Sequence, residues 1–563
     1  MKDLKWWQKT VVYQVYPKSF MDTTGSGQGD IAGITSKLDY LKTLGTGAIW
    51  LTPIYPSPMV DNGYDIADYT AIDPMYGSMA DMEKLIAEAK KRNIRIVMDL
   101  VYNHSSDKHP WFIESKQDRT NAKADWYIWR DAKPDGSAPT NWRAIFGGSA
   151  WTWCEERQQY YLHTFAEAQP DLNWENPEVR QALYDAANFW LDKGVGGFRI
   201  DAIVYIKKPA EFVDGVPDSN DGMVNIHSVL ANTPGILDFL HEFKDKVFAG
   251  HDIFTVAEAN GVGPDDLKDW VGDNGVFDML FEFSHMTLEF TNGDLWHCAT
   301  GYTPEIIPGL KQALTASQTA TADNGWYPIF FENHDQLRSV RHFFPDGADN
   351  NLTAKAMATV LLTLRGTPFI FEGQELGMDN VSWSSINDYD DIQSHGQYDL
   401  AREEGFSDSE AMKFVHRYSR DNARTPMQWT RQHQAGFTEG TPWLPVHDDY
   451  RNCCVESEAK DENSVLAYYR KLWRVRSDSA ASDILQQGDY QEILQDSKEI
   501  YAFKRKLAGR EVVTLVNFAD HEVTYELAEL AEAKQVISSQ DGTQVGVLRP
   551  YEAVCYLVKA GEA

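Results

Sequence analysis

Charged side chains close several strongly apolar runs of this 563-residue sequence. One run ends with Arg199 and Asp201, a second with Glu258 and a third with Asp335. In parallel-stranded barrels the reactive groups lie at the carboxyl ends of the strands, where a packing role for a charged residue is awkward. Each carboxylate alone could be a helix N-cap or form a loop salt bridge, but three at equivalent strand ends predict one shared site.

A set of carboxylates of this kind suits the cleavage of glycosidic bonds. That reaction needs one ionised carboxylate at the anomeric carbon and one carboxylic acid that protonates the leaving oxygen. Arg199 lies two residues before Asp201, on the same face of a strand, and should hold Asp201 ionised. Glu258 has no neighbouring cation in the sequence, which favours its protonated form. We therefore expect Asp201 as nucleophile, Glu258 as general acid/base and Asp335 as a third carboxylate.

Eight short β-branched or aromatic runs must position these groups, and each is followed by a turn and a helical pattern. The runs are 11–16, 48–52, 94–101, 197–203, 253–257, 276–283, 326–331 and 368–371. Near-continuous apolar strands that alternate with helical segments such as 79–92 and 177–193 are typical of parallel strands covered by helices. Eight such units predict an α/β fold, the closed (β/α)8 TIM barrel.

Two segments depart from the barrel pattern. Residues 104–173 are rich in Trp, Pro, Gly and charge and are too long for a loop, so they predict an inserted subdomain after strand 3. Short alternating strands in 479–563 predict a C-terminal all-β domain, a β-sandwich. The barrel itself would comprise 1–103 and 174–478.

Composition limits the partners and the compartment. A formal net charge of -32 would repel nucleic acid and anionic membranes, which favours a neutral small-molecule substrate. Five cysteines without a regular spacing indicate reduced thiols. No signal-like segment and no run of about 18 apolar residues is visible, so we expect a cytoplasmic protein that does not associate with membranes. It would be a monomer or a small homo-oligomer.

Seven motifs give the sequence a specific resemblance over essentially its whole length. They are Asn62-Gly-Tyr-Asp65, Asp99-Leu-Val-Tyr-Asn-His104, Gln169-Pro-Asp-Leu-Asn173, Gly197-Phe-Arg-Ile-Asp201, Val256-Ala-Glu258, Asn333-His-Asp-Gln336 and Asn422-Ala-Arg-Thr-Pro-Met-Gln-Trp429. With these motifs the chain resembles the α-amylase superfamily, glycoside hydrolase family 13. It is similar in particular to the group of oligo-1,6-glucosidases, α-glucosidases and trehalose-6-phosphate hydrolases.

The resemblance implies a retaining double displacement on short α-glucosides. Asp201 would form a covalent glucosyl intermediate, Glu258 would protonate the leaving group and then activate water, and Asp335 would bind the 2- and 3-hydroxyls. The family positions that bind the non-reducing glucose match Asp61, Tyr64, His104, Phe146, Phe165, Arg199, His334 and Arg424. Asp61 and Arg424 would close the far end, which implies exo action. Phe146 and Phe165 could instead be subdomain core.

The loop after the first strand departs from the family pattern. Relatives carry a calcium-binding sequence there, of the form Asp-x-Asn-x-Asp-x-x-x-Asp, whose oxygens bind a hard cation. Here the equivalent positions are Asp22, Thr24, Ser26, Gln28 and Asp30, so two amide or carboxylate ligands are lost. Either a weak Ca²⁺ or Mg²⁺ site remains or the loop is held by its own hydrogen bonds. No cofactor is expected to be required.

The residue after the nucleophile bears on linkage. It is Ala202, where relatives specific for α-1,6 bonds or phosphotrehalose usually carry Val. A small side chain resembles enzymes that accept α-1,4 bonds, although one methyl-sized difference is worth only about 1–3 kcal/mol of discrimination. The expected activity is therefore broad, on α-1,4 and/or α-1,6 linked oligosaccharides.

Three other functions stay open. A trehalose-6-phosphate hydrolase would need cations for the phosphate, and the adjacent pair Lys207 and Lys208 is the candidate. A sucrose isomerase or transglucosylase would pass the glucosyl group to another hydroxyl. A non-catalytic transporter-associated barrel is disfavoured, because all three carboxylates are kept and no transmembrane helix is evident.

Overall fold

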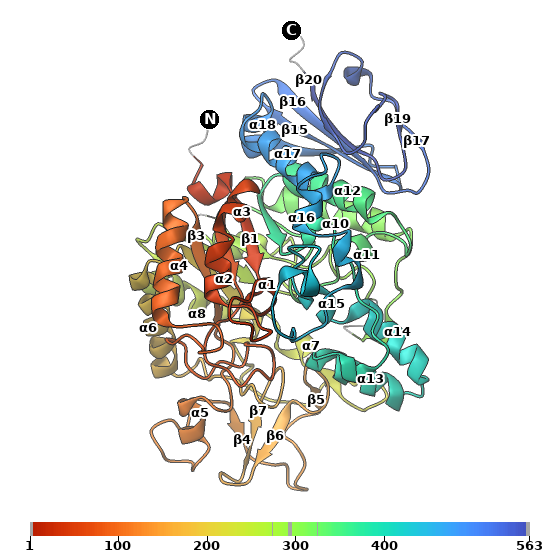
Figure 1. Ribbon diagram of the computed structural model, residues 1–563. Helices are drawn as coiled ribbons and strands as arrows, with labels where there is room; N and C mark the ends of the chain where they lie inside the picture. The colour runs from red at the N-terminus through yellow and green to blue at the C-terminus, as the bar shows by residue number, and fades with distance from the viewer. Residues whose placement is uncertain (1–3, 273, 291–294, 324, 559–563) are drawn as a thin grey trace.

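A parallel eight-stranded sheet forms the centre of the computed structural model, which describes residues 4–272, 274–290, 295–323 and 325–558 (Figure 1). In hydrogen-bonded order the strands are β11 (Met279–Phe281), β10 (Phe254–Glu258), β8 (Gly197–Asp201), β3 (Arg95–Val101), β2 (Thr46–Leu51), β1 (Val11–Val15), β13 (Thr367–Phe371) and β12 (Pro328–Ile329). The end strands β11 and β12 lie against each other, so the sheet closes into a barrel. Each predicted run overlaps one barrel strand, and the predicted α/β barrel is confirmed.

Helices cover the outside of the barrel, which explains why its strands are buried along almost their whole length. The longer helices before the C-terminal domain are α4 (Met79–Lys91), α6 (Pro177–Lys193), α8 (Ile236–Phe243), α10 (Ile306–Ala320), α12 (Asn350–Thr363), α13 (Ile392–Glu403), α14 (Asp408–Tyr418) and α17 (Val465–Ser477). Local sequence sets their ends. For example, Asn176 caps α6 before Pro177, and Gly194 ends it with a left-handed φ of 91°.

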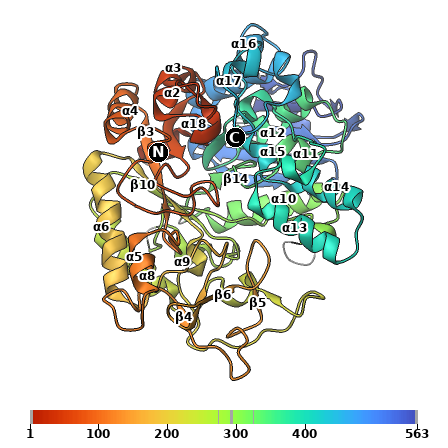
Figure 2. The same cartoon turned by 60° about the horizontal axis from the view of Figure 1, so that its bottom comes forward.

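The segment between β3 and β8 forms a small sheet at one end of the barrel (Figure 2). Its antiparallel strands are β4 (Trp129–Arg130), β7 (Gln159–Leu162) and β6 (Trp151–Cys154). A further strand, β5 (Trp142–Arg143), pairs with β9 (Val224–Asn225), which comes from the long connection after β8. The inserted subdomain therefore includes a piece of chain that the sequence alone assigned to the barrel.

The C-terminal domain lies at the opposite end of the molecule from the subdomain (Figure 1). Short helix α18 (Ser482–Gln487) leads into an antiparallel sheet in the order β14 (Asp489–Ile493), β15 (Ile500–Leu507), β16 (Arg510–Asn517), β20 (Ala553–Val558) and β18 (Lys534–Ser538). Strands β17 (Val523–Thr524) and β19 (Val547–Leu548) form a separate pair. The predicted C-terminal β-structure is confirmed. Among the described residues, no helix is both long enough and apolar enough to cross a membrane.

Candidate active site

Strand register brings the charged residues of the barrel to one level. Asp99 of β3 is the register partner of Arg199 of β8, and Val101 is the partner of Asp201. On the other side of β8, Ala257 of β10 pairs with Ile200, so Glu258 lies level with Asp201. The carboxylates of Asp99, Asp201 and Glu258 therefore surround Arg199, because parallel strands align their side chains at the same edge of the barrel.

The Arg199 guanidinium contacts all three carboxylates. Its Nη1 lies 2.8 Å from Asp99 Oδ1 and 2.6 Å from Asp201 Oδ1, and its Nη2 contacts Glu258 Oε2. Arg199 is 1% exposed, so these contacts are largely shielded from water. The expectation that Glu258 has no adjacent cation was wrong, since the sequence does not show that β10 places Glu258 beside a residue of β8.

The protonation of this cluster follows from burial and charge together. Burial raises the pKa of Asp201 well above its usual range, with Arg199 opposing the shift and Glu258 reinforcing it. Burial likewise raises the pKa of Glu258, again against Arg199. Two neighbouring carboxyls with raised pKa values share one proton over a range of pH. The pair therefore supplies one acid and one base. We expected Arg199 to hold Asp201 ionised, but burial raises the pKa of Asp201 in spite of this guanidinium.

Asp335 belongs to a different electrostatic environment. Although burial opposes ionisation, His334, Arg420 and Arg424 together hold the pKa of Asp335 well below its usual range. Its Oδ1 lies 2.7 Å from Arg424 Nη2 and 3.3 Å from Arg420 Nη1, while His334 Nε2 lies 3.0 Å from Oδ2. Burial lowers the pKa of His334 to about 4. Asp335 is thus an anion that can accept hydrogen bonds from hydroxyl groups.

One loop supplies Asp61 and Tyr64 from the far side of the site. Asp65 fixes this loop by accepting hydrogen bonds from the backbone N–H groups of Val60 and Asp61, at 2.9 and 3.1 Å. The Tyr64 hydroxyl donates to Asp99 Oδ2 at 3.0 Å, and its ring is stacked on His334 with a centroid distance of 5.1 Å. Asp65 therefore fixes the backbone at Asp61, while Asp99 and His334 fix the side chain of Tyr64.

A buried amide links this loop to the subdomain. Gln169 Nε2 donates to Asp61 Oδ2 at 3.0 Å and lies 3.1 Å from His104 Nε2. The His104 ring packs against Phe165 at 5.2 Å, and burial lowers its pKa to about 4. Gln169 is the first residue of the motif Gln169-Pro-Asp-Leu-Asn173, and the sequence alone assigned it no role. It holds Asp61 and His104 together.

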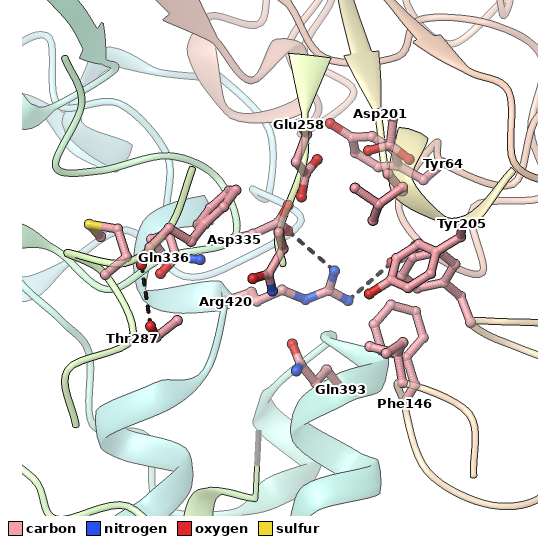
Figure 3. Close-up of a pocket in the computed structure, with 18 of the residues that line it drawn as sticks. Tyr64, Phe146, Asp201, Tyr205, Glu258, Thr287, Asp335, Gln336, Gln393 and Arg420 are labelled. Atoms are coloured by element: carbon pink, nitrogen blue, oxygen red, sulfur yellow. Dashed lines mark hydrogen bonds and ion pairs between the residues drawn. The ribbon is translucent and has the colours of Figure 1, made fainter. Parts of the chain in front are cut away.

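These residues line a cavity of about 190 Å³ (Figure 3). Nine of the twelve predicted catalytic and substrate-binding residues are part of its lining, namely Asp61, Tyr64, His104, Phe146, Phe165, Asp201, Ala202, Glu258 and Asp335. Arg199, His334 and Arg424 are not: each is at most 1% exposed and lies behind the wall. Further lining residues include Asn260, Phe283, Met286, Thr287, Phe290, Trp296, Gln336, Gln393, Tyr418 and Arg420.

Arg420 is the functional candidate that the sequence analysis missed. The sequence singled out Arg424 for the end of the pocket, but Arg424 reaches Asp335 from behind, with its Nε donating to the His334 carbonyl at 2.9 Å. Arg420 lines the cavity instead, and its Nη2 lies 3.0 Å from Asp61 Oδ1 (Figure 3). The two arginines are four residues apart, so they share one helical face, and sequence spacing does not decide which one reaches the cavity.

The oxygens of the Asp22–Asp30 loop accept hydrogen bonds from within the protein. Asp22 accepts hydrogen bonds from the N–H groups of Thr24, Gly25 and Gly27 and from the hydroxyls of Thr24 and Thr438. Ser26 Oγ donates to the Gln28 carbonyl at 3.1 Å, and Asp30 accepts from Thr23 and Gly33. Oxygens that a hard cation would use are thus occupied by donors. The described residues contain no cluster of three or more His, Cys, Asp or Glu side chains suited to a metal.

Comparison with known proteins places this site among glycoside hydrolases. Residues 14–488 match the catalytic domain of α-amylase. An oligo-1,6-glucosidase of Parageobacillus thermoglucosidasius is 42% identical over 98% of this chain and 99% of its own length. A trehalose-6-phosphate hydrolase of Bacillus subtilis is also 42% identical, over 98% of both chains. Sequence identity therefore does not separate these two activities.

Solved structures give the same picture. The trehalose-6-phosphate hydrolase of Bacillus licheniformis superposes with a TM-score of 0.89 at 41% identity, covering 99% of this chain and all of that one. The isomaltulose synthase of Klebsiella sp. LX3 superposes with a TM-score of 0.93 at 38% identity, with the same coverage. Three activities share this fold, so the cavity itself must distinguish them.

Proposed function

The chain belongs to the α-amylase family of glycoside hydrolases, and we propose that within it the chain is a retaining, exo-acting α-glucosidase that releases glucose from the non-reducing end of short α-glucosides. One observation carries the proposal: a small cavity is lined by Asp201 and Glu258, which both pair with the Arg199 guanidinium, and by Asp335, which nearby charges hold ionised.

The proposed reaction has two steps. Asp201 attacks the anomeric carbon, while the acid proton that the pair holds passes through Glu258 to the leaving oxygen. The aglycone leaves and a covalent glucosyl ester remains. Glu258, now a carboxylate, takes a proton from water, which attacks the same carbon and frees Asp201. Asp335 accepts hydrogen bonds from sugar hydroxyls, and Arg199 stabilises whichever carboxylate is charged.

The shape of the cavity supports exo action on short chains. Its volume of about 190 Å³ is below the roughly 300–1,000 Å³ usual for ligand pockets, so it suits a single sugar ring at its base. Asp61 and Arg420 form an ion pair in its wall. A chain that continued past this pair would collide with it, so only a chain end can enter.

The charges in the cavity argue against a phosphorylated substrate. Among the described lining residues, Arg420 is the one Arg or Lys, and it is already paired with Asp61, Asp335 and Asp391. Lys207 and Lys208, the candidate phosphate ligands, line a different cavity. There Lys207 is paired with Glu175 and Lys208 with Asp171, at 2.6 and 2.7 Å. A phosphate group would therefore meet carboxylates without a free cation.

The linkage preference of the proposal is broad. Ala202 lines the cavity directly after the nucleophile, and its small side chain leaves room for aglycones that approach at different angles. We further propose a cytoplasmic enzyme that acts as a monomer or small homo-oligomer. Cys154, Cys453, Cys454 and Cys555 form no disulfide, which supports a reducing compartment.

A substrate panel on the purified protein tests the proposal. Free glucose is measured with p-nitrophenyl α-glucoside, maltose, isomaltose, sucrose, trehalose and trehalose 6-phosphate, and Asp201→Asn is the matched inactive control. We expect glucose from the neutral α-glucosides and none above the control from trehalose 6-phosphate. Activity confined to trehalose 6-phosphate would overturn the proposal and indicate a trehalose-6-phosphate hydrolase. Conversion of sucrose to isomeric disaccharides without free glucose would indicate an isomerase.

A further inference from the structure

A glycine stands in the interior of helix α13, at Gly396. Glycine destabilises a helix interior relative to alanine, so its presence needs a reason. Gly396 has no left-handed backbone angle that would require it. However, a Cβ atom at this position would lie 2.1 Å from the backbone carbonyl oxygen of Phe146, a separation that side chains do not reach. The helix and the subdomain loop therefore meet backbone to backbone.

Both sides of this contact carry residues of the active-site cavity. Phe146 lines it from the subdomain loop, and Gln393 lines it from the first turn of α13 (Figure 3). The Phe146 ring lies 5.6 Å from the Phe165 ring, which in turn packs on His104. A change in the distance between α13 and the loop therefore moves the Phe146 ring relative to the rest of the cavity wall.

Arg420 ties the same two elements to the carboxylates. Its guanidinium lies over the Phe146 ring at 4.8 Å and pairs with Asp391 at 2.6 Å. Asp391 is the N-cap of α13, accepting hydrogen bonds from the backbone N–H groups of Gln393 and Ser394. The third and fourth partners of Arg420 are Asp61 and Asp335. The loop, the helix and the sugar-binding carboxylates therefore form one connected wall.

We propose that Gly396 is a positioning residue that sets how closely Phe146 approaches the bound glucose. The inference rests on the proposed function, because it assigns the cavity to a glucosyl group. An alanine methyl at 396 forces α13 and the Phe146 loop apart by about 1 Å. A displacement of that size in a sugar-binding wall is enough to lower kcat/KM by up to about 100-fold.

The test compares Gly396→Ala, Phe146→Ala and the double variant of the full chain. The expected result is that each single variant lowers kcat/KM for p-nitrophenyl α-glucoside by about 10- to 100-fold, mainly through KM. The double variant should lose little more than Phe146→Ala alone, because the methyl group acts by displacing a ring that is no longer there. Asp399→Ala, on the exposed side of the same helix, is the matched control and should keep the parent values.

Two results would overturn the proposal. One is a Gly396→Ala enzyme within twofold of the parent, and the other is a double variant whose losses multiply. Calorimetric titration with 1-deoxynojirimycin, a glucose analogue, gives a readout that needs no turnover. If the parent binds the analogue but cleaves no glucoside, the hydrolase proposal fails. The Kd of Gly396→Ala then still decides the role of Gly396: a weakened Kd supports it and an unchanged Kd rejects it. If Gly396→Ala does not fold, Phe146→Leu, which leaves the backbone contact intact, must raise KM for p-nitrophenyl α-glucoside, or the proposal is rejected.

Discussion

At the scale of single residues, the site is organised by cations that serve several anions at once. Arg199 contacts Asp99, Asp201 and Glu258, and Arg420 contacts Asp61, Asp335 and Asp391. A buried carboxylate without a partner would take up a proton rather than stay charged. Since six carboxylates share these two guanidinium groups, their pKa values spread apart. The acid, the base and the fixed anion needed for glycoside cleavage arise from that spread.

Asp99 provides a test of this electrostatic account. Its negative charge raises the pKa of both Asp201 and Glu258, so Asp99→Asn should lower both values. Activity needs one proton on the pair Asp201 and Glu258, so the pH profile is bell-shaped. Its acid limb follows the lower of the two pKa values of the pair, and its alkaline limb follows the higher one. Both limbs of kcat/KM for p-nitrophenyl α-glucoside should therefore move to lower pH. Limbs that stay in place, or match those of the exposed control Asp399→Asn, would contradict the account.

Ala202 provides a second test, on linkage. Its backbone is left-handed, with φ 43° and ψ 33°, a conformation in which β-branched residues are outliers. Because valine adds branching to a Cβ that alanine already has, Ala202→Val should lower the free energy of unfolding. It should also lower kcat/KM for maltose relative to isomaltose by about 10-fold, since the side chain narrows the cavity beside the scissile bond. Ala202→Gly, which relieves the backbone and adds no bulk, should keep the parent ratio. An equal ratio in the valine variant would remove Ala202 from the linkage argument.

At the scale of elements, the loop after β1 is held by hydrogen bonds to a distant segment. Thr438, from a segment more than 400 residues away, donates to Asp22 Oδ2 at 2.5 Å and helps to hold the pKa of that carboxyl below its usual value against burial. We predict that a chelator leaves Tm unchanged. Thr438→Val should lower the free energy of unfolding by about 1–3 kcal/mol, because it leaves a buried charged acceptor short of a donor. Thermal unfolding with and without chelator checks both, and a fall in Tm with chelator alone would favour a bound cation.

The strands, more than the site, could be predicted from the sequence. Apolar runs such as 11–16 and 197–203 are long enough to identify buried parallel strands, and the barrel topology predicts that reactive residues lie at the carboxyl ends of strands. The sequence does not show which residues of neighbouring strands are level, so the contact of Arg199 with Glu258 was missed. It also does not show close approach between distant elements. Gly396 has no local signature that distinguishes it from an ordinary unfavourable helix residue.

At the scale of the whole molecule, the C-terminal sheet is packed onto the barrel through a shared core. Tyr501, Phe503, Val512 and Val516 belong to the same buried cluster as the barrel residues. The other face of the sheet has a separate core that includes Val513 and Leu515. The catalytic barrel therefore depends on the sheet for burial of its own apolar surface, although the inserted subdomain that supplies Phe146 lies at the opposite end (Figure 1).

Lys311 of α10 makes this dependence measurable. Its ammonium group donates to the backbone carbonyls of Leu494, Gln495 and Ser497, at 3.2, 3.3 and 2.5 Å, and so fixes the loop between β14 and β15 to the barrel. Lys311→Met leaves these carbonyls without their donor and should lower the free energy of unfolding by about 1–3 kcal/mol. Because Lys311 is not in the lining of the active-site cavity, kcat/KM of the folded enzyme should not change.

Calorimetry distinguishes the possible outcomes for Lys311→Met, with Lys460→Met as a control whose side chain is 73% exposed. One cooperative transition, shifted to lower Tm by a few degrees in Lys311→Met and unshifted in the control, is the expected result for two domains with a shared core. A new early transition in Lys311→Met, with activity retained above it, would mean that the sheet unfolds alone and that the barrel does not need it. In that case the buried residues Tyr501 and Phe503 would contribute to the sheet but not to the stability of the catalytic domain.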